Sequence, residues 1–98
     1  MKVLNPKQQR YLRSLAHKLK PVVIIGNAGL TEGVVNEINL SIEHHELIKV
    51  RINAADRQSR TDMIQAICDA TESVVVLSIG HIAVFYRPSK QPVLPLPK

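Results

Sequence analysis

Apolar residues recur with the period of a helix over the first twenty positions. Asn5, Pro6 and Gln8 have the spacing of a capped helix start, with Gln8 three residues after the cap. Pro21 disfavours helical geometry at the residue before it, so this helix is predicted to end near Lys20. Its apolar stripe consists of Leu12, Leu15, Ala16 and Leu19.

A strand, a helix and a second strand are predicted next. The continuous apolar run at 22–25 predicts a short strand that is buried on both faces. Thr31 is expected to cap a helix that runs to about His45 and turns inward Val34, Val35, Ile38 and Ile42. Residues 46–52 alternate as in a strand, whose inner face carries Ile48, Val50 and Ile52. Its other face carries Leu47, Lys49 and Arg51.

The last third of the chain predicts a helix and a hairpin. After a polar loop at 53–58, Ser59 is expected to cap a helix with an apolar side of Met63, Ile64, Ile67 and Ala70. Strands are predicted at 73–79 and 82–86 around a tight turn at Gly80 and His81. The last eleven residues contain four prolines. We therefore expect one domain over 1–88 and a flexible, extended proline-rich tail over 89–98.

This order of elements predicts an α/β domain with two layers around a mixed four-stranded sheet. Right-handed strand–helix–strand connections place the second and third helices on the same face of that sheet. The last strand, at 82–86, is apolar on both sides and is therefore expected inside the sheet. The first helix is expected to cover part of the opposite face.

The charge of the chain is unevenly distributed. The net charge is +5, but residues 1–31 carry six basic side chains and no acidic one. Residues 32–72 hold all eight acidic residues against four basic ones, and the remainder adds three positive charges. Such an asymmetry in a small basic domain favours one basic surface and a polyanionic partner, either a nucleic acid or an anionic membrane.

Composition excludes several classes of protein and ligand. No apolar stretch is long enough to span a bilayer, and the first ten residues lack the apolar core of a secretory signal, so we expect a cytoplasmic protein. Cys68 is the only cysteine, which excludes an internal disulfide and any paired-cysteine metal site. With three aromatic residues, the chain cannot build an extended base-stacking platform. If the polyanionic partner is a nucleic acid, the domain is therefore expected to recognise its backbone and shape more than its bases.

The segment Gly26-Asn27-Ala28-Gly29 joins a strand to the start of a helix, which Thr31 is expected to cap. Unpaired N–H groups and the positive end of the helix dipole suit such a position to a phosphate. Two glycines in a strand-to-helix turn can also serve the turn alone. The segment is neither a nucleotide P-loop nor a dinucleotide fingerprint, because the residues that define those motifs are missing.

Basic side chains that precede this loop are the candidates for phosphate contacts: Lys7, Arg10, Arg13, Lys18 and Lys20. Arg51, Arg57 and Arg60 are further candidates. A basic stripe on a helix can also be a solvated face or a membrane-surface helix, although the first helix has no Trp or Phe to insert. A protein-interaction module without RNA specificity is the related alternative.

The sequence gives little support for an enzyme or a metal site. His44 and His45 are adjacent, so on a helix they point about 100° apart and do not jointly face one metal ion. No Ser-His-Asp or paired-carboxylate pattern is present, although a triad assembled in space leaves no pattern in the sequence. We expect no catalytic residues, no cofactor, no metal and no small-molecule substrate.

Four segments in order resemble the CRM domain family in its stand-alone bacterial YhbY-type form. They are Leu15–Val23, Gly26–Val34, His44–Arg51, and Ile79-Gly80 together with Val84–Pro88, within a resemblance that covers residues 2–88. The resemblance implies a fold similar to the C-terminal domain of translation initiation factor three, with the last strand central. It also implies RNA binding in ribosome maturation, through a GxxG loop at 26–29 and a basic first helix.

From this resemblance we expect a monomer that binds ribosomal RNA in large-subunit precursors. The expected loop contacts are Gly26, Asn27, Ala28, Gly29 and Thr31. The sequence departs from the family at Thr71-Glu72-Ser73, where similar proteins often have a Thr-Gly turn.

Overall fold

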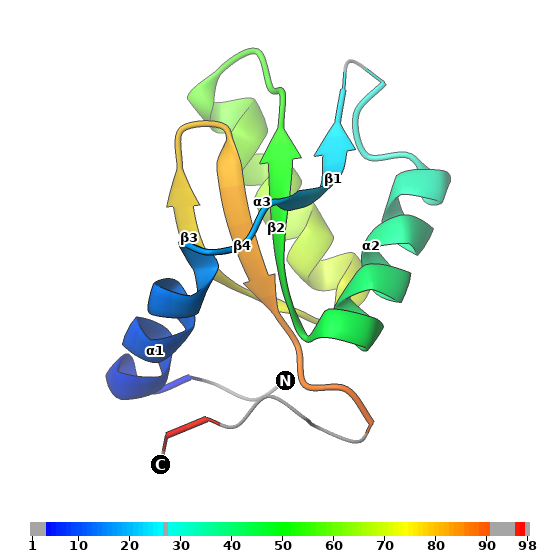
Figure 1. The fold of residues 1–98 in the computed structure, drawn as a ribbon. Helices are drawn as coiled ribbons and strands as arrows, with labels where there is room; N and C mark the ends of the chain where they lie inside the picture. Colours follow the sequence, from blue (N-terminus) through cyan, green and yellow to red (C-terminus); the bar gives the residue numbers. More distant parts are fainter. Residues whose placement is uncertain (1–3, 27, 91–95, 98) are drawn as a thin grey trace.

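The computed structural model describes residues 4–26, 28–90 and 96–97 of the 98-residue chain. Three helices and four strands follow one another in the predicted order (Figure 1). The elements are α1 (Pro6–Ala16), β1 (Pro21–Ile25), α2 (Glu32–His45), β2 (Leu47–Ile52), α3 (Arg57–Thr71), β3 (Val74–Ile79) and β4 (Ile82–Tyr86).

The sheet has the strand order β1-β2-β4-β3. β1 and β2 are parallel and are connected through α2, whereas β4 is antiparallel to both of its neighbours. β4 therefore lies inside the sheet, as its apolar sequence predicts. Ala83, Val84 and Phe85 are fully buried, and Tyr86 is nearly so.

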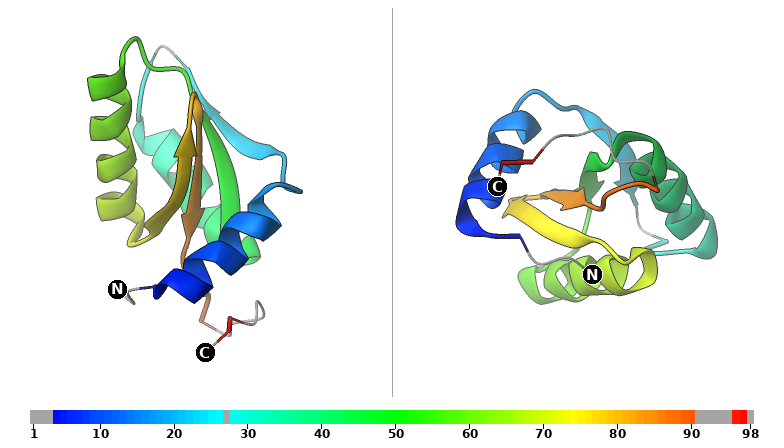
Figure 2. Two further views of the ribbon diagram at one scale, coloured as in Figure 1. Left: turned by 90° about the vertical axis from the view of Figure 1, so that its left-hand side faces the viewer. Right: turned by 90° about the horizontal axis from the view of Figure 1, so that it is seen from below.

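The two faces of the sheet carry separate hydrophobic cores. α2 and α3 cover one face, where Ile38, Ile42 and Ile67 pack with Phe85 of β4. α1 packs on the opposite face through Leu12 and Ala16, against side chains that include Val84, Tyr86 and Val76. Figure 2 shows α1 on one side of the sheet and α2 and α3 on the other. The predicted placement of the three helices is confirmed.

The prediction that the 22–25 strand is buried on both faces is wrong. β1 is an edge strand, and its residues alternate between buried and exposed. Val23 and Ile25 face the α2 core, while Val22 is 43% exposed and Ile24 is 62% exposed. An apolar run fits either a strand buried on both sides or an edge strand with one open face, because both lack polar positions.

Two helix ends differ from the prediction. α1 ends at Ala16, and Lys18 and Leu19 donate backbone hydrogen bonds three residues back, as in a tightened final turn. The chain therefore leaves the helix before Pro21 can end it. α3 begins at Arg57 and not after Ser59, because Asp56 is its cap and accepts the Ser59 N–H at 2.7 Å.

The C-terminal turn of α3 buries a different side chain from the one predicted. Ala70 is exposed, and Thr71 is buried in its place. The Thr71 hydroxyl donates to the carbonyl oxygen of Ile67 at 2.7 Å and also pairs with Ser73 at 2.8 Å. These bonds satisfy the polar atoms that the buried turn would otherwise leave unpaired.

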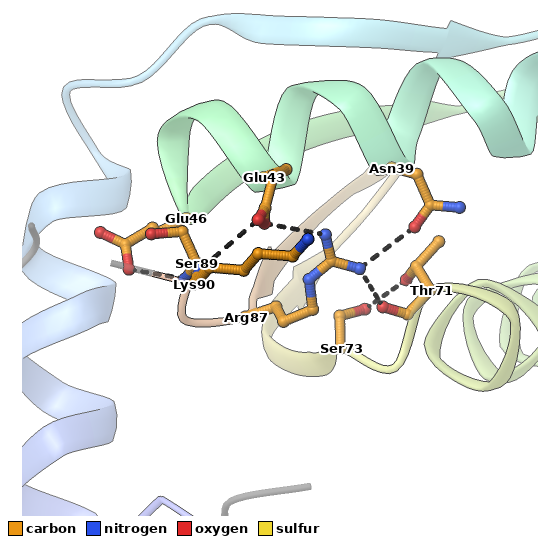
Figure 3. Close-up of polar contacts among 8 residues, drawn as sticks. All are labelled: Asn39, Glu43, Glu46, Thr71, Ser73, Arg87, Ser89 and Lys90. Carbon is orange, nitrogen blue, oxygen red and sulfur yellow. Dashed lines mark hydrogen bonds and ion pairs between the residues drawn. The ribbon is translucent and has the colours of Figure 1, made fainter. Parts of the chain in front are cut away.

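A polar network at the end of β4 ties the sheet to both helices of the larger core (Figure 3). The Arg87 guanidinium donates to Asn39 of α2 at 3.1 Å and to the Thr71 carbonyl oxygen of α3 at 2.7 Å. It also forms an ion pair with Glu43 at 3.6 Å. The buried Glu46 carboxylate accepts the Ser89 N–H at 2.9 Å. Arg87 therefore holds α2 and α3 in register at one end of the sheet.

The flexible tail predicted for 89–98 stays a prediction, and its described residues contact the domain. Besides the Ser89 bond, the Pro97 carbonyl oxygen accepts from the Gln8 side chain at 3.0 Å. Leu96 packs against the core beneath α1. The asparagine cap of α1 is confirmed, with the predicted reciprocal bonds between Asn5 and Gln8 at 2.8 and 3.1 Å.

Replacing Glu72 with glycine should raise the free energy of unfolding by about 1 kcal/mol. Glu72 has φ 53° and ψ 41°. This left-handed conformation costs a residue with a side chain roughly 1–2 kcal/mol, and glycine adopts it readily. Urea unfolding followed by circular dichroism measures the change. Glu72→Gln removes the charge but keeps the side chain, so equal stabilisation by both variants would contradict the backbone explanation.

Candidate nucleic-acid interface

Three loops meet at the end of the sheet where β1 and β2 finish. The Asn53 N–H, after β2, donates to the Ile25 carbonyl oxygen, at the end of β1, at 3.0 Å. The β3–β4 turn joins them, since the His81 carbonyl oxygen accepts the Ile52 N–H at 2.6 Å. The carboxyl ends of parallel strands, with the helix N-termini that follow them, are the common ligand-binding edge of α/β sheets. Figure 1 shows these loops together at the top of the molecule.

The Gly26–Gly29 segment is a closed turn in this group of loops. The Gly29 N–H donates to the Gly26 carbonyl oxygen at 3.0 Å, and the Thr31 N–H donates to that of Gly29 at 3.1 Å. Gly29 has φ +74° and therefore needs to be glycine for the turn. Its N–H is used inside the loop, which reduces the number of amides free to bind a phosphate. Asn27, a predicted contact, lies outside the described residues.

Gly26 is the glycine that the turn does not explain. It is exposed, has no positive φ, and a Cβ built on it would meet no atom within 4 Å. Glycine is favoured at such a place when another backbone must approach closely. Ala28, the neighbouring candidate, is also exposed.

The N-terminus of α2 follows this turn, and one of its free N–H groups already has an acceptor within the protein. Thr31, predicted to contact RNA, caps the helix with a hydroxyl that accepts the Val34 N–H at 3.2 Å. The N–H groups of Glu32 and Gly33 are then the ones without an intrahelical acceptor. Glu32 places a carboxylate in the same turn, which opposes a second anion there.

Candidate cations on α1 have different roles. Lys7 and Arg10 are exposed on the side of the helix opposite Leu12, and they are available to a ligand. The Arg13 Nε donates to the Val76 carbonyl oxygen of β3 at 3.1 Å, so this residue also attaches α1 to the sheet. The sequence could not show that role, because the bond spans 63 positions of the chain.

Lys18 and Lys20 lie in the segment between α1 and β1 and not on the helix, and both are exposed. They line the same hollow as Lys49 of β2, which we did not predict as a contact. Two residues along, Arg51 is exposed and donates to Asn53 at 3.4 Å. The alternation of apolar and basic residues along β2 indicated that Lys49 is a candidate contact, because it places Lys49 and Arg51 on the face away from the α2 core.

These side chains connect the two ends of the domain. α1 lies at the end of the sheet remote from the glycine loop (Figures 1 and 2). The candidate cations of α1 and the candidate contacts in the loop are therefore separated by about the length of β1. We use the term basic face for the cations that extend from α1 across β2 towards the loop: Lys7, Arg10, Lys18, Lys20, Lys49 and Arg51.

Arg57 and Arg60 lie at the start of α3, on the other layer of the domain. They share the end of the sheet with the glycine loop, because the 53–56 segment leads into α3. Arg57 is exposed and Arg60 is half-buried. The structure therefore groups them with the loop and not with α1.

Other candidate chemistry finds little support in the described part of the chain. No group of three His, Cys, Asp or Glu side chains there could hold a metal ion. Burial raises the pKa of the Cys68 thiol, which disfavours the reactive thiolate. The hollow beside Cys68 is lined by Asp69 and Glu72, whose charges repel a polyanion. Within the same residues, no helix has the length and apolar character needed to cross a membrane.

Comparison with known proteins finds relatives over almost the whole chain. The family model of the CRS1 / YhbY (CRM) domain matches residues 4–87. The chain is 48% identical over 98 residues to a protein of Haemophilus influenzae named RNA-binding protein, covering 100% of this chain and 99% of the relative. It is 39% identical over 89 residues to Probable RNA-binding protein PA4753 of Pseudomonas aeruginosa, covering 91% and 86%.

A solved structure shows the same fold. The solution structure of the hypothetical protein SAV1595 of Staphylococcus aureus, described as a candidate RNA-binding protein, superposes with a TM-score of 0.84. Its sequence is 38% identical, and the match covers 97% of this chain and 100% of that one.

The two glycines of the loop should differ in their effect on stability. Gly29→Ala should lower the free energy of unfolding by about 1 kcal/mol, because alanine is strained at positive φ. Gly26→Ala should change it by less than about 0.5 kcal/mol, because the site is open and its φ is not restricted to glycine. Urea unfolding of both variants measures the difference, and equal losses would contradict the assigned turn.

Proposed function

The chain belongs to the CRS1/YhbY (CRM) domain family, and on this premise we propose that it is a non-catalytic RNA-binding protein. It binds the RNA backbone through the basic face and through the glycine loop. The RNA is ribosomal, in precursors of the large subunit, and the protein assists their maturation as a cytoplasmic monomer. The basic face, which carries six cations between α1 and the loop, is the observation that supports this proposal most strongly.

Charge and exposure suit the basic face to phosphates. Its lysine ammonium groups and arginine guanidinium groups are strong donors to phosphate oxygens, and none of the six forms an ion pair with a described acidic side chain. All eight acidic residues lie between 32 and 72. Displacement of counterions by these cations provides affinity that is independent of base sequence.

The glycine loop contributes close approach and not charge. An RNA backbone can come nearer to Gly26 than to any residue with a Cβ, because the space above Gly26 is open. The N–H groups at the start of α2 lie just beyond the turn and are oriented by the helix. This arrangement resembles the backbone clamp that GxxG loops form in other RNA-binding domains.

Burial of the apolar side of α1 argues against a membrane-surface helix. Leu12 and Ala16 are fully buried against the sheet, and a helix that binds a bilayer needs such residues at the surface. The basic side of α1 is therefore available to RNA while its apolar side holds the fold together.

Neutralising Lys7 and Arg10 should weaken RNA binding and reduce its dependence on salt. Each lost phosphate contact lowers the slope of log affinity against log salt by roughly 0.7–0.9, so Lys7→Gln with Arg10→Gln should lower it by about 1.4–1.8. Fluorescence anisotropy with a structured ribosomal RNA fragment over a salt series measures the slope.

A charge-matched control distinguishes contact from net charge. Asn36→Asp with Leu40→Glu also lowers the charge by two, at exposed positions of α2 on the opposite layer. This control should leave the slope near that of the wild type. Equal reductions in both double variants would show that α1 makes no specific phosphate contact.

A leucine at Gly26 should reduce affinity for the same RNA without unfolding the domain. The added side chain enters the open space where the RNA backbone is expected, and it meets no protein atom near its Cβ. We expect a loss of at least about tenfold. Ala70→Leu, at an exposed position of α3 that is not a candidate RNA contact, is the matched control and should keep the wild-type affinity. If Gly26→Leu left the affinity unchanged, the loop would be a structural turn that does not contact the RNA backbone.

The ribosomal part of the proposal has its own test. Ultraviolet crosslinking of the tagged protein in cells, followed by sequencing of the bound RNA, should recover precursors of large-subunit ribosomal RNA. The protein should also sediment with large-subunit precursor particles. Recovery of unrelated RNAs, with no sedimentation near ribosomal particles, would refute the ribosomal assignment and leave RNA binding intact.

A further inference from the structure

An apolar hollow of about 510 Å³ opens where the segment after α1 meets β1 and β2. Its aliphatic lining includes Leu15, Leu19, Val22 and Leu47. Its size lies within the roughly 300–1,000 Å³ of small-molecule pockets. We infer that this hollow receives one unstacked nucleobase of the bound RNA, an inference that rests on the proposed function.

The charge around the hollow identifies the kind of ligand. Lys18, Lys20 and Lys49 contribute to its lining, and no acidic residue does. Lysine stems add apolar surface to a pocket while their ammonium groups stay in water. A nucleotide has the matching chemistry, since a flat base of low charge is attached to an anionic phosphate. Unstacked bases inserted into protein pockets are a usual mode of single-stranded RNA recognition.

The backbone of β1 supports the same assignment. β1 pairs only with β2 among the described strands, so the N–H and C=O groups along its outer edge have no strand partner. The pairing also shifts by one residue at Val22, between Pro21 and Val23. Such an irregularity redirects a side chain and is frequent beside binding sites. Val22 is 43% exposed, so its side chain is accessible to a ligand in the hollow that it lines.

The hollow and the glycine loop lie at the two ends of one strand. Val22 and Gly26 are four residues apart, or about 13 Å at the usual rise of a strand. One RNA strand can therefore place a phosphate at the loop and a base in the hollow, with Lys49 and Arg51 alongside. The scarcity of aromatic residues predicts recognition of backbone and shape alone. The hollow adds a base contact, and its described lining includes the imidazole ring of His45 but no Phe, Tyr or Trp.

The test compares a stem-loop RNA that has a mixed-sequence loop with the same RNA carrying an abasic loop. The two probes have equal numbers of phosphates, so their affinity ratio reports contacts to bases. The wild type should bind the base-containing loop about tenfold more tightly, as expected for burial of a small apolar surface. Val22→Gln should bring the ratio close to one and leave the affinity for the abasic probe unchanged.

Ile24→Gln is the matched control, because Ile24 lies on the same face of β1 but outside the hollow. It should keep the wild-type ratio. Leu19→Gln provides a second change in the lining if Val22→Gln disturbs the strand. A wild-type ratio of one, or an unchanged ratio in both lining variants, would overturn the base pocket.

Two further outcomes separate this inference from the proposed function. Wild-type protein that binds both probes equally and with a steep salt dependence would refute the pocket but support RNA binding. Failure to bind either probe would refute the proposed function and the pocket with it. Anionic phosphatidylglycerol vesicles are included as a competitor. If Val22→Gln abolished vesicle binding and preserved the RNA ratio, the hollow would hold a lipid chain and not a base.

Discussion

Burial of β4 on both faces is the constraint on which the rest of the domain depends. Phe85 of this strand packs under α2 and α3, whereas Val84 and Tyr86 pack under α1. The strand is also hydrogen-bonded to β2 on one side and β3 on the other. A strand of five residues thus joins two hydrophobic cores, and each core requires helices on its own face of the sheet.

The unequal cover of the two faces produces the candidate binding surface. α2 and α3 together cover one face, whereas the eleven residues of α1 cover only part of the other. The outer part of β1 and β2 is left open on that side, with Ile24 and Arg51 exposed. The lysines between α1 and β1 lie beside this open area. Lys49 and Arg51, the two cations that β2 adds to the basic face, are therefore accessible because α1 covers only part of this face.

Much of the fold follows from local patterns in the sequence. The Asn5 and Gln8 cap, the Thr31 cap and the turn at Gly80 depend on residues close in the chain, and all three were predicted correctly. The two-sided apolar pattern of β4 also predicts its interior position. Errors arose where local patterns permit two outcomes: an apolar run fits an edge strand as well as a central one, and Asp56 competes with Ser59 as a cap.

The sequence by itself determined the order of the elements, the segregation of charge and the presence of a glycine turn before α2. These features depend on composition and on spacings of a few residues, and both can be read directly from the sequence. Only the tertiary structure decided that Arg13 attaches α1 to β3, that Lys49 joins Lys18 and Lys20 at one hollow, and that α1 and the loop lie at opposite ends of β1. These relations join residues far apart in the chain, and packing of the helices on the two faces of the sheet fixes them.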